Sequence, residues 1–136
     1  MGNNKSGLSV VASIAGEKSG NMHELSYITR LCKIAEATAV EQNAKSVDTL
    51  SIQVGEMTGL IPEYLQRYYP GVVKGTILDG SKLEIEYLPV KTRCSDCGEL
   101  YHPCKDNSYL CPNCSSPKGE IINGREFLIK NMIIDD

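Results

Sequence analysis

The chain has 136 residues, of which 41% are hydrophobic and 23% are charged. This balance is typical of a globular protein and excludes a disordered or fibrous one. The 14 lysines and arginines are outnumbered by 17 aspartates and glutamates, and the net charge of −3 argues against a protein that coats nucleic acid. No apolar stretch approaches the roughly 18 residues that a membrane-spanning helix needs, so we expect no membrane protein.

The first 21 residues are rich in glycine, serine and asparagine and show no clear periodicity. We therefore predict that residues 1–21 are a flexible extension or tag, followed by a second possible start at Met22. The apolar run at residues 8–15 is short and poorly flanked for an export signal. We accordingly expect a cytoplasmic protein with reduced cysteines.

The apolar pattern of the next sixty residues predicts two helices and a strand. Apolar residues at helical spacing predict an amphipathic helix over residues 23–43. Residues 48–56 alternate between apolar and polar, as in a half-buried strand. Pro62 followed by an acidic residue predicts the start of a second helix, which Pro70-Gly71 should end or kink.

Residues 82–90 and 125–134 have the pattern of two further strands, on either side of a cysteine-rich segment. The sequence therefore predicts an α+β fold: a small three-stranded sheet with two helices, plus an inserted four-cysteine module like a zinc ribbon. Such a module is too small for a core and needs a metal to hold it together. The predicted domains are residues 22–91, completed by a strand at 124–136, and the module at 92–123.

Two Cys-x-x-Cys pairs point to the metal site. Cys94 and Cys97 form the first pair and Cys111 and Cys114 the second, with thirteen residues between the pairs. Each pair can enter one tetrahedral site from a tight turn, so together they predict structural Zn²⁺ bound by four thiolates. A disulfide framework is the alternative, and it would need an export signal.

Three other residues could take part in metal binding. His102 and Cys104 lie between the two pairs and could replace a ligand, although four cysteines already complete a structural zinc site. Cys32 lies at an apolar position of the first helix and is better explained as a core residue.

The module has little charge with which to bind nucleic acid. Five basic and four acidic residues lie between Lys91 and Arg125, and four thiolates on Zn²⁺ leave the module at about −1. A protein that binds by releasing counterions needs a clear positive surplus, so we expect no nucleic-acid partner. The sequence also lacks a nucleophilic triad and a glycine-rich phosphate loop, and we therefore expect no enzyme.

The sequence Met22-His23-Glu24 gains meaning if Met22 is the first residue. A free α-amine, the following amide nitrogens and the His23 imidazole form a compact nitrogen donor set, which favours Ni²⁺ or Cu²⁺ in a square-planar or tetragonal arrangement. With residues 1–21 attached, the Met22 nitrogen is a peptide amide, and the strongest donor is lost.

Four segments together resemble the HypA/HybF family of hydrogenase maturation nickel chaperones. They are Met22-His23-Glu24-Leu25-Ser26 at the start of a helix, VGEMTGLIPEYL, LEIEYLP and the two Cys-x-x-Cys pairs. The segments occur in the family's order, and the resemblance runs from Met22 to the C-terminus.

The resemblance implies a nickel-binding domain and a separate zinc domain. His23 would be the essential Ni²⁺ ligand, Met22 would contribute its amine and Glu24 its backbone amide or a neighbouring carboxylate. Zinc would be bound by Cys94, Cys97, Cys111 and Cys114. The nickel would be delivered to the large subunit of NiFe-hydrogenase with a HypB-type GTPase as partner, and some relatives also serve urease through its accessory proteins.

Three other functions remain open from the residues. The chain could be a zinc-ribbon adaptor that binds a protein partner without nickel transfer, an electron carrier with one iron on the four cysteines, or a zinc-ribbon RNA-binding protein. The sequence leaves open whether the protein is a monomer or a homodimer.

Overall fold

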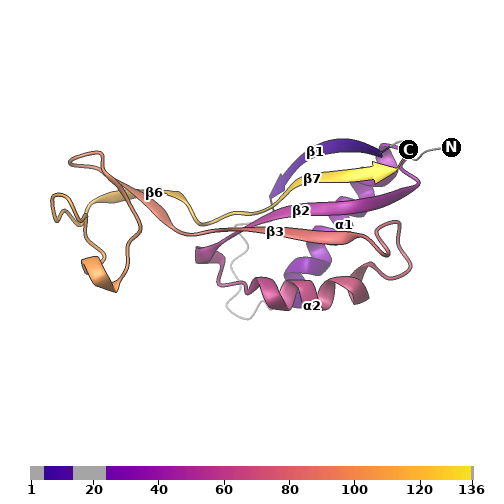
Figure 1. The fold of residues 1–136 in the computed structure, drawn as a ribbon, viewed down its shortest axis with the longest axis horizontal. Coiled ribbons are helices and arrows are strands. Elements are labelled where there is room, and N and C mark those ends of the chain that lie inside the picture. The colour runs from indigo at the N-terminus through magenta and orange to yellow at the C-terminus, as the bar shows by residue number, and fades with distance from the viewer. Residues whose placement is uncertain (1–4, 14–23, 136) are drawn as a thin grey trace.

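The structure is a computed structural model and describes residues 5–13 and 24–135. A four-stranded sheet has the order β1-β7-β2-β3, and a three-stranded sheet has the order β5-β4-β6. Figure 1 shows an elongated molecule, with the larger sheet and both helices at one end and the smaller sheet at the other. The elements are β1 (Lys5–Ser13), α1 (Glu24–Glu41), β2 (Ser46–Gly55), η1 (Glu56–Thr58), α2 (Pro62–Val73), β3 (Lys82–Leu88), β4 (Lys91–Cys94), β5 (Leu100–Tyr101), η2 (Lys105–Asn107), β6 (Gly119–Asn123) and β7 (Phe127–Asp135).

Helix α1 forms because its apolar residues recur on one face, as predicted. That face packs behind the larger sheet in Figure 1, while the other face is in solvent. Tyr27 at its first turns meets Phe127 of β7 edge to face, with ring centroids 5.3 Å apart. Leu25 belongs to the same pattern but is 47% exposed. The buried residues of α1 are Ile28, Leu31, Cys32, Ala35 and Ala39.

Helix α2 starts at Pro62, as predicted, but passes through Pro70 and ends at Val73. Of the two predicted effects of Pro70-Gly71, ending the helix is therefore wrong, and a kink stays a prediction. Proline removes one backbone hydrogen bond, but Leu65, Tyr69 and Val73 are buried at four-residue spacing on both sides of it. Their packing against the core holds the last turn in place.

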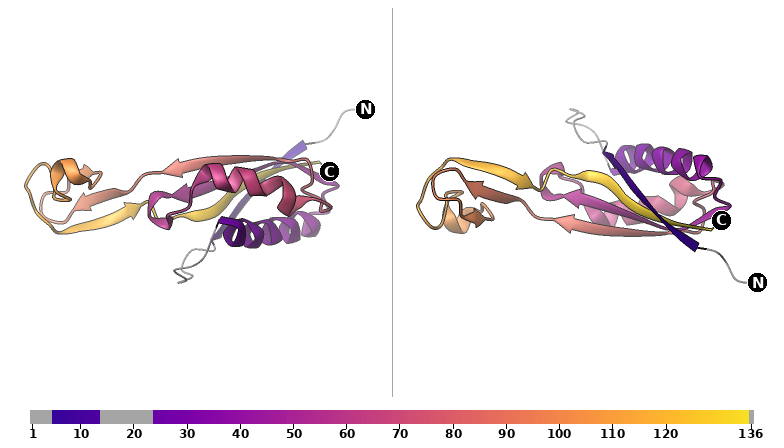
Figure 2. Two further views of the ribbon diagram at one scale, coloured as in Figure 1. Left: turned by 90° about the horizontal axis from the view of Figure 1, so that it is seen from below. Right: turned by 90° about the horizontal axis from the view of Figure 1, so that it is seen from above.

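Strand β2 is one of the two inner strands of the larger sheet, next to β7. It pairs with β3 in parallel, from Thr49 opposite Lys82 onward, and with β7 in antiparallel orientation. Leu50, Ile52 and Val54 are buried, as their alternation predicted. The helices lie on one side of this sheet (Figure 2), and its other face carries polar pairs such as Gln53 with Glu86.

Residues 5–13 form strand β1, where the sequence predicted a flexible extension. The strand pairs with β7 in antiparallel orientation, from Lys5 opposite Asp135 to Ser13 opposite Leu128. The physical reason lies in β7, whose second edge would otherwise present unpaired backbone N–H and C=O groups. The larger sheet therefore has four strands and not three. The α+β class, the two helices and the inserted cysteine module are confirmed.

The chain leaves the larger sheet after β3, builds the small sheet with β4, β5 and β6, and returns with β7. We use "cysteine module" for residues 91–123 and "neck" for residues 55–57, 90 and 124, where the two sheets meet. Among the described residues, no helix is long and apolar enough to cross a membrane.

Candidate metal centre

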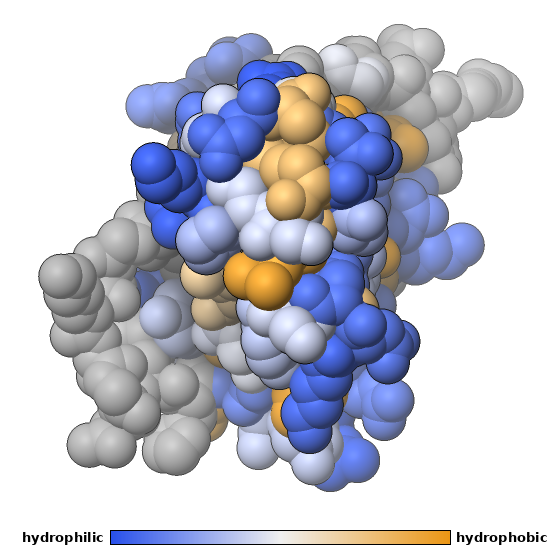
Figure 3. Space-filling model, turned by 90° about the vertical axis from the view of Figure 1, so that its left-hand side faces the viewer, coloured by the Kyte–Doolittle hydropathy of each residue, from blue (hydrophilic) through white to orange (hydrophobic). Residues whose placement is uncertain are grey.

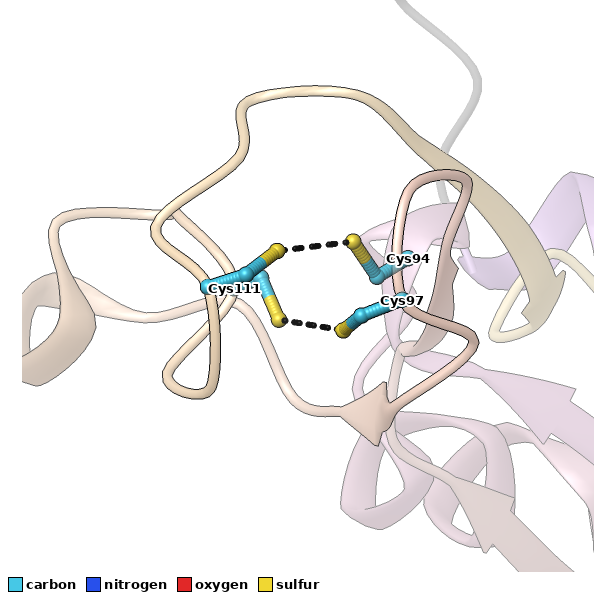
Figure 4. A group of neighbouring side chains, drawn as sticks. Cys94, Cys97 and Cys111 are labelled. Carbon is cyan, nitrogen blue, oxygen red and sulfur yellow. Dashed lines mark hydrogen bonds between the residues drawn. The ribbon is translucent and has the colours of Figure 1, made fainter.

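The four cysteines of the two Cys-x-x-Cys pairs meet in the cysteine module. Their Sγ atoms all lie within 4.8 Å of one another. Cys94 and Cys114 approach to 3.5 Å, Cys97 and Cys111 to 3.6 Å, and the sulfur atoms turn toward a common centre in Figure 4. Zn–S bonds of about 2.3 Å in a tetrahedron place sulfurs about 3.8 Å apart, so the donor set fits a tetrahedral metal ion.

The two pairs use the same turn. In the first, Gly98 N–H donates to Cys94 O at 3.0 Å, and in the second Ser115 N–H donates to Cys111 O at 2.7 Å. Gly98 and Ser115 both have positive φ, +79° and +60°. Glycine adopts this conformation at no steric cost, which is why Gly98 could be predicted, whereas Ser115 gave no such signal.

Cys97 and Cys94 lie in surroundings that favour thiolates. The Asn113 side-chain amide donates to Cys97 Sγ at 3.4 Å, and this bond lowers the pKa of Cys97 to about 7. The backbone N–H of Cys97 likewise lowers the pKa of Cys94. The Ser116 backbone N–H lowers the pKa of Cys114, but hydrogen bonding to Cys94 Sγ and burial outweigh it and raise that pKa to about 12. Thiolates are the form that binds metal. All six cysteines of the chain have free thiols, so the disulfide framework is not what the structure contains.

A hydrogen bond links the two turns independently of a metal. Ser116 Oγ, on a residue that is 7% exposed, donates to Asp96 Oδ2 at 2.5 Å. The same Oγ accepts the N–H of Lys118 at 3.1 Å. Sequence reasoning missed this pair, because nothing in the spacing of Asp96 and Ser116 indicates that they meet.

The remaining candidates lie outside the cluster. His102 Nε2 is 3.0 Å from Glu56 Oε1, and Cys104 belongs to the turn that starts η2. Cys32 is 6% exposed in the core, where burial raises its pKa to about 12, so its interpretation as a core residue is confirmed.

Met22 and His23 lie outside the described residues, and Glu24 is the first residue of α1. The Glu24 carboxylate accepts the backbone N–H of Ile61 at 3.1 Å, which joins the start of α1 to the start of α2. Nothing in the spacing of Glu24 and Ile61 predicted this contact.

Comparison with known proteins decides the family. The sequence profile described as "Hydrogenase/urease nickel incorporation, metallochaperone, hypA" matches residues 22–134. The chain belongs to the HypA family. The family consists of metallochaperones that act in hydrogenase maturation, so the expectation of a protein without enzymatic activity is confirmed. Strand β1 lies outside the match.

Individual HypA proteins resemble this chain over most of their length. The hydrogenase maturation factor HypA of Dehalococcoides mccartyi (strain CBDB1) is 34% identical over 115 residues, which are 85% of this chain and 96% of that protein. HypA of Picosynechococcus sp. is 35% identical over 111 residues, 82% of this chain and 97% of the relative.

Two solved structures share the fold. The solution structure of the Ni metallochaperone HypA from Helicobacter pylori superposes with a TM-score of 0.57 at 20% identity, over 82% of this chain and 96% of that one. A second solution structure of a HypA protein gives a TM-score of 0.63 at 21% identity, over 85% of this chain and 98% of that one.

Proposed function

We propose that this chain binds Ni²⁺ at the start of α1 and delivers it for the maturation of NiFe-hydrogenase. The ligands are the His23 imidazole, the Glu24 backbone amide or a neighbouring carboxylate and, in a chain that begins at Met22, the Met22 amine. With residues 1–21 attached, that nitrogen is a peptide amide, and we expect weaker binding. The observation that carries the proposal is that the HypA match begins at Met22, two residues before the start of α1 at Glu24. Nitrogen donors of this kind favour Ni²⁺, and a site of few ligands at a chain end exchanges its metal without unfolding the protein.

We further propose that the four-cysteine centre holds structural Zn²⁺. Its four sulfur donors within 4.8 Å of one another fit zinc. Cys94 and Cys111 are 1% exposed, and Cys97 and Cys114 are on the surface. When bound, the metal cross-links the two turns. A single iron would fit four sulfurs as well, and it would show as colour and as iron in elemental analysis.

The two proposed metal sites belong to two different domains. Residues 22–91 with the strand at 124–136 form the nickel-binding domain, and residues 92–123 form the zinc-binding domain. The partners are a HypB-type GTPase and the large hydrogenase subunit, in the cytoplasm, with urease accessory proteins as a further possibility that the family description supports. The second candidate function is a zinc-ribbon adaptor, which shares the cysteine centre but transfers no nickel.

The deciding experiment is a calorimetric Ni²⁺ titration of three zinc-loaded chains that begin at Met1, Ser19 and Met22. We expect the chain that begins at Met22 to bind most tightly, because only there is the Met22 nitrogen a free amine. The chain that begins at Ser19 is the matched control, since it also lacks β1 but keeps that nitrogen as an amide, and its own amine lies four residues before His23. Equal affinities of the two short chains contradict a role for the amine.

The variant His23→Ala tests the imidazole in the chain that begins at Met22. We expect tight nickel binding to be lost while zinc content stays at one per chain, because the four cysteines by themselves complete a tetrahedral site. Loss of both metals contradicts two separate sites. Absence of nickel binding in the parent chain favours the adaptor.

A further inference from the structure

The neck brings three chain segments into backbone contact. Gly55 N–H donates to Glu126 O at 2.6 Å, and Met57 N–H donates to Gly124 O at 2.7 Å. A Cβ atom on Gly55 would overlap the Gly124 carbonyl, and one on Gly124 would lie 2.8 Å from Val90 Cα. The two segments that carry the cysteine module, at residues 90 and 124, therefore both rest on the end of β2 and on η1.

One carboxylate joins the neck to the cysteine module. Glu56 Oε1 accepts the backbone N–H of Val90 at 2.9 Å and lies 3.0 Å from His102 Nε2. The Val90 hydrogen bond and then His102 hold the pKa of Glu56 below its usual value, so the group is an anion at neutral pH. The His102 and Glu56 side chains are 48% and 40% exposed. We call the contact of Glu56 with Val90 and His102 the clasp.

On the module side, His102 is fixed to the loop between the two cysteine pairs. The Asn107 side-chain amide donates to His102 O at 3.0 Å. The Asn107 amide oxygen accepts the N–H groups of Cys104 at 3.1 Å and Tyr109 at 3.0 Å. The imidazole that reaches Glu56 therefore belongs to the same hydrogen-bonded loop that leads into Cys111.

On the other side, η1 connects to the start of α1. Thr58 Oγ1 donates to Gly55 O at 2.8 Å and accepts the N–H of Leu60 at 3.1 Å. The next residue, Ile61, donates its N–H to the Glu24 carboxylate. Residues 55–61 thus bond to the cysteine module at one end and to the first residue of α1 at the other.

We propose that Glu56 is a positioning residue whose clasp with His102 sets the orientation of the cysteine module on the larger sheet and, through residues 57–61, steadies the start of α1. The effect on the start of α1 rests on the proposed nickel site beside Glu24, whereas the effect on the orientation of the cysteine module does not. Through the clasp, the orientation of the cysteine module can affect the geometry at the start of α1, although the two metal sites share no ligand.

The orientation is tested with NMR residual dipolar couplings of the zinc-loaded full chain. One alignment tensor should fit the amides of β2, β7, β4 and β6 together. The variant His102→Ala removes the module's half of the clasp and keeps the Val90 bond, so the module should then need a separate, smaller tensor. His102→Gln should restore the single tensor, because its amide N–H can donate to Glu56. Lys105→Ala is the matched surface control.

If a single alignment tensor still fits both sheets in His102→Ala, the clasp does not set the orientation of the cysteine module. Zinc content of one per chain shows in the same sample that the module is folded, so a lost fold cannot be mistaken for a lost clasp.

The coupling is tested by Ni²⁺ titration of the chain that begins at Met22. Loss of an exposed charged contact should weaken nickel binding by about twofold to fivefold in His102→Ala. His102→Gln should recover the affinity, which a direct nickel ligand would not do, because an amide replaces an imidazole poorly. Unchanged affinity in His102→Ala overturns the coupling. If the unsubstituted chain that begins at Met22 binds no nickel, the proposed nickel site and its link to the clasp are both wrong. The residual dipolar couplings then still test whether the clasp orients the cysteine module.

Discussion

The larger sheet with its helices and the cysteine module are stabilised in different ways. Among the residues whose burial the structure describes, the first has a core of 19 buried hydrophobic residues from α1, α2, the strands and the segments between them. The module has three, of which two are the cysteines Cys94 and Cys111. Figure 3 views the molecule from the module's end, where apolar residues form a narrow stripe between hydrophilic ones. A hydrophobic core can fold one region by itself, whereas the other needs a cross-link, which a bound metal supplies.

Metal removal should separate the two regions most clearly. Structural zinc contributes about 10–16 kcal/mol to the folding of small zinc modules, so the metal-free chain should lose β4, β5 and β6 and keep the larger sheet. Amide NMR spectra of zinc-loaded and chelator-treated protein measure this, with Cys111→Ser as the genetic equivalent and Cys104→Ser as the control. Loss of the β2 and β7 signals together with the module would show that the regions fold as one.

The reverse experiment weakens the hydrophobic core of the larger sheet and leaves the metal centre unchanged. Phe127 is fully buried and contacts Tyr27, so Phe127→Ala should lower the free energy of unfolding by about 3–5 kcal/mol. Denaturant unfolding followed by far-UV circular dichroism measures the loss, and Ile129→Val should cost about 0.5–1.5 kcal/mol as a mild control. Zinc content should stay at one per chain below the unfolding transition. A Phe127→Ala chain without zinc would contradict independent stabilisation.

Strand β1 covers the edge of the larger sheet that β7 would otherwise expose. Removal of residues 1–21 leaves β7 with an unpaired edge, and exposed edges favour association between chains. We expect the chain that begins at Met22 to self-associate more strongly than the full chain at the same concentration. Analytical ultracentrifugation measures the difference, and identical sedimentation at all concentrations would show that β1 does not protect this edge.

The smallest effect should come from the link between the cysteine turns. Ser116→Ala removes the hydrogen bond to Asp96, and the loss of one hydrogen bond to a charged group costs about 1.5–3 kcal/mol. The turns should then hold metal less well, with faster zinc transfer to a chromogenic chelator. Ser115→Ala, at the neighbouring exposed position, is the control. Equal transfer rates would mean that the thiolates alone organise the site.

The sequence predicted those features that repeat locally. Helix α1 follows from apolar residues at helical spacing, β2 from alternation, and the metal centre from two pairs of cysteines with fixed spacing. Each of these signals lies within a few residues of the structure it specifies.

The features that the sequence did not predict depend on distant partners. Strand β1 is a strand because β7 offers it an edge, and Pro70 stays within α2 because the core holds the residues around it. The contact between Glu56 and His102 joins residues 46 positions apart. Such contacts form only in the assembled fold, and the spacing of apolar and polar residues along the sequence does not predict them.

The position of β7 in the larger sheet has a consequence for how the protein is made. Strand β7 is the last element of the chain, yet it lies between β1 and β2. During synthesis the larger sheet therefore cannot close until Asp135 has been added, whereas the fourth cysteine, Cys114, is present before β7 begins. Because pairing between distant strands is slow, metal capture by the nascent module can precede closure of the sheet. The smaller region, which lacks a core, is the one that can reach its final structure first.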